Sequence, residues 1–512
     1  MLAFNFKIMK VKKYIYSAFV FATVLSSCQK LEEKPYGLVN TSSFYKTEAD
    51  ANSALAYAYS ILPEVGYYSR GYYIITELPT ENLTQKGDAG VSNFELDEIR
   101  TTPANADLDN LWTYLYRGIA RANSVIANVP NVEGITAANK NQIIGEGYFL
   151  RALHNFNLVR LFGAVPLRTD VIADAGQVPM AKSSISDIYN LIESDLKNAE
   201  GLMSVAKNKE GRANKVAAQA LLAKVYLHLA SSKSYNSPGY AFVDDAETKY
   251  TNAKTYAAKV INEQSVFGFT NTLVDIWNTA LYKTSGSVTE HIFDAAVDRL
   301  GVREGEYTKL PNMFLGSDRP MSIPYNPSNP SSPVINIGQG WNHFRTEAGH
   351  YNSYANNDRR KTDLIVSSYT NSGTVYNLDI NSASRPFSRK FIDPGRDADK
   401  MNANSPIIRY SDILLVYAEA AGPSEGYSAV NRIRARAGLG DLPPSLSVKA
   451  FRDAVILERA WELAFEGNRL FDLRRTNGME KMAQDYRKTI TSGAYFFPIP
   501  QRELDTNPLM KP

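Results

Sequence analysis

The chain has 512 residues, with 56 Lys and Arg against 53 Asp and Glu, and a formal net charge of +3. This near-neutral balance argues against nucleic acid or an anionic membrane surface as the main partner. Cys28 is the single cysteine, which excludes an intramolecular disulfide and leaves packing to stabilise the fold. The 31 tyrosines are a rich supply of flat, amphipathic side chains for recognition.

The N-terminus predicts a secretory leader over residues 1–27. Residues 1–13 carry four lysines and no acid, and the uncharged stretch "YIYSAFVFATVL" follows. That stretch is shorter than the helix of about 20 residues that spans a bilayer, as in signal peptides. The segment "LSSC", which ends at Cys28, resembles a bacterial lipobox and implies lipid attachment there; a free cysteine is the alternative. Removal of the leader lowers the net charge by four, from +3 to −1.

Helical periodicity runs through the N-terminal third, beginning at about residue 47. Thr47 is the predicted N-cap of the first helix, with acids in its first turn, and Pro63 is expected to end it. Further helices are predicted at 106–129, 136–163, 184–202, 212–232 and 247–263. The last two would form a hairpin of roughly 34 residues, the tetratricopeptide period. We therefore expect a mainly α fold with about four degenerate tetratricopeptide-like helical pairs.

Residues 264–400 are rich in turn residues. Gly, Pro, Asn and Ser are densest in "PYNPSNPSSPVINIGQGWNHF", at 324–344, and cannot form helix interiors at that density. The runs "HIFDAAV" and "DLIVSSY" predict short strands. Helices are expected again at 406–421, 427–437 and 448–475. The sequence thus predicts a helical scaffold at 28–263, a loop-rich ligand-binding region at 264–400 and a C-terminal helical part at 401–512.

Distinctive blocks of sequence occur at both ends of the chain. The C-terminal blocks are "IIRYSDILLVYAEA" (407–420), "VNRIRARAGL" (430–439), "RAWELAFEGNRLFDLRR" (459–475) and "YFFPIPQRELDTNP" (495–508). The N-terminal blocks are "YYIITELPTENL", "LWTYLYRGIARANSVI" and "EGYFLRALHNFNLVRLFGAVPL". In order and spacing these blocks resemble the SusD/RagB family of nutrient-binding lipoproteins of Bacteroidota, and the resemblance covers nearly the whole mature chain except the central loops.

The resemblance implies a carbohydrate-binding lipoprotein without enzymatic activity, anchored in the outer membrane and facing the cell exterior. Such a protein covers a SusC-like TonB-dependent barrel and passes oligosaccharides to it. Glu32 and Glu33, just after Cys28, resemble the surface-export signal of these lipoproteins, although a solvated linker has the same composition. Capture of peptides or another non-glycan nutrient in the same transporter complex is one alternative, and a glycoside hydrolase is another.

Three glutamates, Glu458, Glu462 and Glu466, recur every four residues within the helix predicted at 448–475. A glycosidase needs two carboxyl groups about 5–10 Å apart across a cleft, one of them with a raised pKa. Nearby arginines lower carboxyl pKa values instead. We therefore expect a structural ion-pair network, and its expected arginine partners are Arg409, Arg432, Arg434 and Arg436.

The sequence contains no evident catalytic or metal-binding motif. His343, Glu347 and His350 are close together, but their spacing fits neither the helical zinc motif nor a zinc finger. No serine lies in a Gly-x-Ser-x-Gly elbow. We expect no catalytic residue, no metal site and no cofactor; a structural calcium ion stays open because Asp and Asn are plentiful in the central loops.

A sugar ring has an apolar C–H face and a rim of hydroxyls, so its site needs aromatic platforms beside polar groups. The best local match is "GQGWNHFRTE" (338–347), followed by "KGDAGVSNFELDE" (86–98) in the N-terminal half. The predicted ligand-binding residues are Trp341, Phe344, Asn342, Arg345, Tyr325 and Phe94, with His343 and Asp88 as further polar groups. The alternative is that Trp341 packs into the scaffold, as is expected of Trp112, Trp277 and Trp461.

Overall fold

The structure is a computed structural model. It describes residues 44–206, 211–284, 288–302, 305–316, 319–398 and 400–510. Residues 45–512 form one compact unit. The leader and Cys28 lie outside the described residues, so the lipid anchor stays a prediction. None of the helices that the structure describes is both long and apolar enough to span a membrane.

The N-terminal helices follow the sequence prediction closely. Helix α2 (Glu48–Tyr59) begins with a capping box, in which Thr47 and Asp50 bond reciprocally to each other's backbone N–H. It ends before Pro63, and the short helix α3 (Gly71–Glu77) follows. The longer helices are α5 (Ala106–Asn128), α6 (Ala137–Phe162), α7 (Ile185–Leu202), α8 (Lys215–Ser234) and α9 (Ala246–Asn262).

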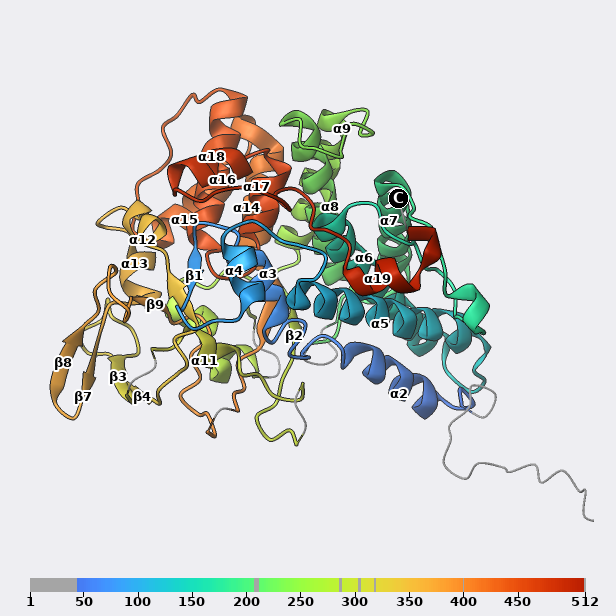
Figure 1. The fold of residues 1–512 in the computed structure, drawn as a ribbon, viewed down its shortest axis with the longest axis horizontal. Helices are drawn as coiled ribbons and strands as arrows, with labels where there is room; N and C mark the ends of the chain where they lie inside the picture. The colour runs from blue at the N-terminus through green and yellow to red at the C-terminus, as the bar shows by residue number, and fades with distance from the viewer. Residues whose placement is uncertain are drawn as a thin grey trace, which may run out of the picture. The chain divides into compact units, whose positions relative to one another are not determined.

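These long helices stack in chain order. Each of α5–α9 packs against the next, and α9 also packs against α14 (Tyr410–Ala421) (Figure 1). Every residue of α6 from Phe149 to Phe162 is buried, so this helix lies inside the stack. In α8 the buried face alternates alanine with Leu, Val and Tyr, which lets α9 approach closely. The mainly α fold of tetratricopeptide-like helical pairs is confirmed.

The C-terminal third departs from the prediction at two places. Residues at the start of the helix predicted at 406–421 form strand β10 (Ser405–Arg409), which pairs antiparallel with β2 (His291–Ala295) before α14 begins. The single helix predicted at 448–475 is two helices, α16 (Val448–Glu462) and α17 (Arg469–Arg475). Helix α15 (Tyr427–Arg436) agrees with the prediction, and α18 (Met479–Asp485) and α19 (Gln501–Thr506) complete the chain.

The break between α16 and α17 has a side-chain cause. Phe465 and Gly467 adopt positive φ angles of 69° and 75°. The buried Lys390 ammonium donates to the backbone oxygens of Glu462 and Ala464, both at 2.9 Å, and Arg409 also donates to the oxygen of Glu462. These cations take carbonyl groups that a continuing helix would use, so the helix ends at Glu462.

The central region carries its own small core. A four-stranded sheet, ordered β4-β3-β7-β8, consists of β3 (Met321–Pro324), β4 (Val334–Ile337), β7 (Ser368–Asn371) and β8 (Thr374–Asn377). Strand β2 lies in the first run predicted to be extended, and the second run, residues 363–369, contains β6 (Ile365–Val366) and the start of β7. The core beneath the sheet includes Met321, Ile323, Ile337, Phe387 and Met401. In Figure 1 the sheet lies to the left, apart from α5–α9 on the right.

The remaining short elements link this region to the helices. Strand β6 (Ile365–Val366) pairs with β9 (Phe387–Ser388), and β1 (Leu83–Gln85) pairs with β5 (Phe344–Thr346). The short helices are α4 (Val91–Asp97), α10 (Thr279–Tyr282), α11 (Leu310–Phe314), α12 (Ala348–Ser353) and α13 (Arg359–Asp363). The β1–β5 pair matters most here, because it joins the N-terminal third to the central region.

Candidate functional site

Two segments predicted separately as parts of a sugar site lie side by side. Strand β1 pairs antiparallel with β5, with Leu83 opposite Thr346 and Gln85 opposite Phe344. This pairing sets residues 86–98 beside residues 338–347, and we call these two segments the paired loops. A hydrogen bond of 2.9 Å between Asn93 Nδ2 and His343 Nε2 joins them directly. Segments about 250 positions apart in sequence thus form one surface.

The 338–347 loop is held by its backbone against α11 and the residue that follows it. The N–H groups of Trp341, Asn342 and His343 donate to the oxygens of Asn312, Leu315 and Met313, at 2.6, 2.9 and 2.9 Å respectively. A Cβ atom at Gly340 would meet the backbone oxygens of Leu315 and Asn312 within 3 Å, so only glycine allows this close approach. The loop is therefore docked on the core, which fixes the position of Trp341.

Trp341 is the exposed aromatic of this loop, with 41% of its surface accessible. Phe344 is buried, at 1% exposure, and packs on Phe314 with ring centroids 5.0 Å apart. Phe344 therefore cannot be a platform, contrary to the prediction, because its place in β5 turns it toward the core. Phe94 is half-buried in α4. The aromatic surface of the paired loops consists of Trp341 and the exposed part of Phe94.

Polar groups flank Trp341 in the paired loops. Asn342 has a positive φ of 49°, and its side chain donates to the oxygen of Ala383 at 3.1 Å. Arg345 is half-buried and donates to the oxygen of Gln85. Burial and the neighbouring Arg385 lower the pKa of Arg345. Both side chains are thereby fixed in position while part of each stays accessible.

Arg385 is a member of this surface that the sequence reasoning missed. Its guanidinium donates to the oxygen of Thr346 at 3.2 Å and lies 3.6 Å from the Glu347 carboxylate. No local motif surrounds Arg385, and it is far from residues 338–347 in the sequence. The sequence alone therefore did not indicate that it belongs to this surface. Asn93, the partner of His343, was missed for the same reason.

Tyr325 does not belong to the paired loops and lines a separate small cavity. Its hydroxyl donates to Asp275 at 2.5 Å and accepts from Asn278 Nδ2 at 2.8 Å. It lines a small cavity with Trp277 and Arg389. These contacts do not support the prediction that Tyr325 binds ligand together with Trp341, because local hydrogen bonds hold the Tyr325 ring at this small cavity.

The two histidines near the paired loops, His343 and His350, have different hydrogen-bond partners. Burial, followed by the positive charges of Arg70 and Lys86, lowers the pKa of His343 to about 4. His350 is buried and bonds the Tyr354 hydroxyl at 3.1 Å, while Glu347 caps α12. Within the described residues, no group of three His, Cys, Asp or Glu side chains is arranged to hold a metal ion.

Of the three tryptophans expected in the core, two are buried. Trp112 and Trp277 are 3% and 7% exposed. Trp461 is half-buried, and its indole N–H donates to Ser353 at 3.0 Å. The prediction was wrong for Trp461 because helical spacing alone did not reveal that it lies at the edge of α16.

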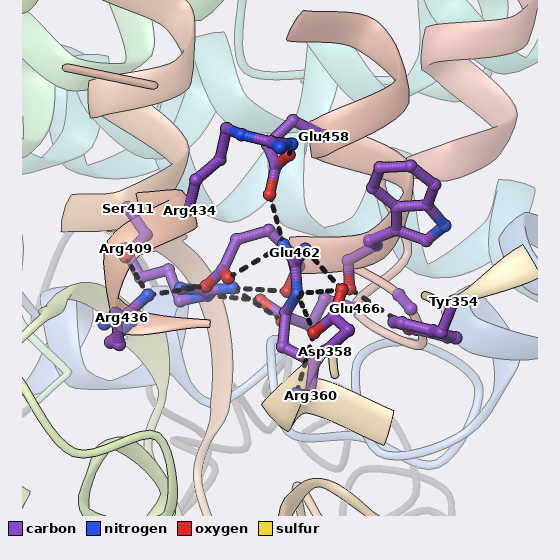
Figure 2. Close-up of polar contacts among 12 residues, drawn as sticks. Tyr354, Asp358, Arg360, Arg409, Ser411, Arg434, Arg436, Glu458, Glu462 and Glu466 are labelled. Atoms are coloured by element: carbon purple, nitrogen blue, oxygen red, sulfur yellow. Dashed lines mark hydrogen bonds and ion pairs between the residues drawn. The ribbon is translucent and has the colours of Figure 1, made fainter. Parts of the chain in front are cut away.

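The glutamates of the C-terminal third form a buried ion-pair network (Figure 2). Glu462 accepts from Arg436 Nη2 at 2.7 Å, and its carboxylate lies 2.9 Å from Arg409 Nη1. Glu458 accepts from Arg360 and Arg434, at 2.6 and 2.8 Å. Glu466, which lies beyond the end of α16, accepts from Arg409 and Lys390, each at 2.7 Å.

The network includes residues that the sequence analysis did not predict. Glu290, the residue just before β2, also belongs to the network. It accepts hydrogen bonds from Arg409, Arg436 and the Ser411 hydroxyl. Arg432, a predicted member, lies over the Phe269 ring instead, at 4.4 Å from its centroid. Only the tertiary fold brings Glu290 and Arg360 to these glutamates.

The network does not have the character of a glycosidase site. Glu462 is 1% exposed. Burial alone would raise its pKa, but Arg436, Arg409 and Arg360 outweigh burial and hold it at about 2. A general acid needs a raised pKa and contact with the substrate. These carboxylates instead join α15, α16, β10 and α13 into one rigid block.

A larger cavity, of about 420 Å³, lies along α5. Its walls combine the aromatic Tyr116, the exposed apolar Val171 and Val178, and the charged Arg168 and Arg502. None of the predicted ligand-binding residues lines it. It is separate from the paired loops and provides a control region for experiments on them.

Comparison with known proteins identifies the family. A family model described as "SusD family" matches residues 342–511, and one described as "Starch-binding associating with outer membrane" matches residues 31–227. SusD-like protein P2 of Formosa agariphila is 27% identical over 98% of this chain and 99% of its own. The chain belongs to the SusD/RagB family. Residues 86–98 lie inside the starch-binding match, and residues 342–347 lie inside the SusD match.

Solved SusD-family structures share the fold. A SusD superfamily protein from Parabacteroides distasonis aligns with a TM-score of 0.74 at 21% identity, over 91% of this chain and 98% of that one. Surface glycan-binding protein A from Bacteroides thetaiotaomicron, in complex with laminarihexaose, aligns with a TM-score of 0.69 at 20% identity, over 90% and 98%. At these identities the likeness establishes the SusD-type architecture of the helices.

Proposed function

We propose that this SusD-family protein is a lipid-anchored lipoprotein on the outer face of the outer membrane that binds oligosaccharides. It delivers them to a SusC-like TonB-dependent transporter. The observation that carries the proposal is Trp341, an exposed tryptophan whose backbone is held by hydrogen bonds and which lies among amide and guanidinium groups. Support also comes from the family, one of whose models is described as starch-binding, and from a structural neighbour solved with laminarihexaose.

The geometry of the paired loops suits a sugar. The indole of Trp341 offers a flat apolar surface to the C–H face of a pyranose ring. Asn342, Arg345 and Arg385 are within the same surface and can bond to ring hydroxyls. Stacking contributes roughly 0.5–1.5 kcal/mol per ring beyond area burial, so one or two platforms give weak binding. Weak binding lets the protein release an oligosaccharide to a transporter.

The test is calorimetry or affinity electrophoresis against a panel of oligosaccharides and polysaccharides. We expect one glycan class to bind and Trp341→Ala to weaken it by about 2- to 13-fold, the equivalent of the stacking energy above. Tyr57→Ala is the matched control, because Tyr57 is an exposed aromatic on α2. Weakening by Tyr116→Ala, with Trp341→Ala silent, would move the site to the α5 cavity and refute the paired-loop assignment.

A non-glycan nutrient is the alternative within the same proposal. The panel distinguishes it: peptide binding without any glycan binding would replace oligosaccharide by peptide. The lipid anchor is tested by mass spectrometry of the mature N-terminus and by Cys28→Ala, which should release the protein from the membrane fraction. Co-purification of a barrel transporter with the tagged wild-type protein tests delivery; repeated absence of the barrel would contradict it.

A further inference from the structure

Arg389 is a buried cation whose environment differs from that of the arginines in the ion-pair network. It is 6% exposed and follows strand β9. Arg360, Arg409 and Arg436 each contact at least one carboxylate. Among the described residues, the guanidinium of Arg389 makes one hydrogen bond, to the oxygen of Pro324 at 3.1 Å. The guanidinium has five N–H donors, and the Pro324 oxygen is the one acceptor that it contacts among the described residues.

Two acids near this part of the chain have other hydrogen-bond partners. Asp363, the acid that raises the pKa of Arg389, accepts from the Ser328 hydroxyl and from Arg359. Asp275 accepts from the Tyr325 hydroxyl at 2.5 Å. Burial lowers the pKa of Arg389 to about 10, which leaves it charged at neutral pH. An uncompensated buried charge is costly unless an anion or strong acceptors surround it.

Arg474 shows how this chain solves the same problem without a carboxylate. Its guanidinium donates to the backbone oxygens of four residues, which are Arg160, Leu161, Gly493 and Ala494. Arg389 has no such ring of carbonyl groups in the described chain. The other donor atoms of Arg389, Nε and Nη2, thus have no hydrogen-bond partner among the described residues.

A cavity of about 50 Å³ lies at Arg389. Its walls include Trp277, Asn278, Thr279, Tyr325, Leu364 and Ile392. The indole N–H of Trp277 is also buried and has no acceptor within the described residues. At about 10–15 Å³ for each water-sized group, the cavity holds about three to five such groups and is too small for a sugar ring. A buried cation therefore lines a space the size of a small anion.

We propose that the cavity beside Arg389 is a binding site for a small monovalent anion, either a halide or a carboxylate group. Charge-assisted hydrogen bonds from the Arg389 guanidinium would hold the anion. The carboxylate can come from a free short-chain acid or from an acidic sugar that presents only its carboxylate to the cavity. The site rests on Arg389 and the cavity beside it, with Trp277 in the cavity wall, and it is independent of the proposed oligosaccharide site at Trp341.

Iodide quenching of tryptophan fluorescence in the purified full chain tests the proposal. Iodide bound in the cavity lies against Trp277, so we expect a saturable component of quenching on top of the linear, collisional quenching of exposed tryptophans such as Trp341. Arg389→Gln should weaken the saturable component about tenfold or more, the cost of a lost charge-assisted hydrogen bond. Trp277→Phe should remove the saturable signal, and Lys449→Gln, which loses one exposed charge, should leave it unchanged.

Competition identifies the anion. Chloride, acetate and glucuronate are added at constant ionic strength, with glucose as the uncharged control. Displacement by chloride and acetate alone supports a free small anion, and displacement by glucuronate as well supports the carboxylate of an acidic sugar. The absence of a saturable component in the wild-type protein would overturn the proposal, and so would an equal component in folded Arg389→Gln. The wild-type measurement decides the question even if that variant does not fold.

Discussion

Replacement of Glu462 by glutamine tests whether the buried carboxylates are structural. The substitution keeps the shape of the side chain and removes its negative charge. In the wild-type protein this charge faces Arg436 at 2.7 Å, Arg409 at 2.9 Å and Arg360 at 3.6 Å. Glu458, Glu466 and Glu290 each compensate part of this positive charge, so the variant leaves an excess of buried positive charge and no void.

The expected cost follows from the geometry. Removing one partner of a buried ion pair costs about 3–5 kcal/mol, because the other charge stays buried and uncompensated. An unfolding entropy of about 2.1 cal/mol/K per residue, over roughly 470 residues, gives about 1 kcal/mol for each kelvin. The melting temperature of Glu462→Gln should therefore fall by about 3–5 °C.

Differential scanning calorimetry at pH 7 measures the change. Glu425→Gln is the matched control, because Glu425 pairs with Lys254 at the surface, and its melting temperature should not change. An unchanged melting temperature for Glu462→Gln would refute the structural interpretation of the network. Loss of a hydrolytic activity in that variant, at full stability, would assign Glu462 to catalysis and revive the glycosidase alternative.

Three further predictions concern the paired loops and a buried acid. Because the pKa of His343 is lowered to about 4, the ring stays neutral, and the affinity for glycan measured by calorimetry should be constant from pH 8 to 5 and fall near pH 4; a transition near pH 6.5 would contradict this. Gly340→Ala should cost about 1–3 kcal/mol in chemical denaturation by overpacking on Leu315, whereas Gly440→Ala, with open space around it, should not; equal effects would contradict the docking of the loop. Burial raises the pKa of Glu77 to about 8, so its contribution to the free energy of unfolding is full below its ordinary pKa of 4.5 and is lost as pH rises toward 8; a Glu77→Gln variant should not show this loss, and an identical pH dependence in both proteins would exclude Glu77 as its source.

The sequence by itself determined the helical scaffold. Helices α2, α5, α6, α7, α8 and α9 begin and end close to their predicted bounds, because capping residues such as Thr47 and apolar periodicity act within one segment. The family blocks also lie within single segments, so the family was recognisable without a structure. Trp341 and Phe94 were singled out as candidates because aromatic and polar residues cluster locally around each of them.

Tertiary structure decided everything that depends on distant segments. The break after Glu462 follows from cations at Lys390 and Arg409, which a reading of the α16 sequence alone does not include. The β1–β5 pair sets Asn93 beside His343, and register, not composition, turns Phe344 into the core. Arg389 became distinctive only when its contacts were known. Hydrogen bonds and burial between segments far apart in sequence are fixed by packing, and local periodicity carries no information about them.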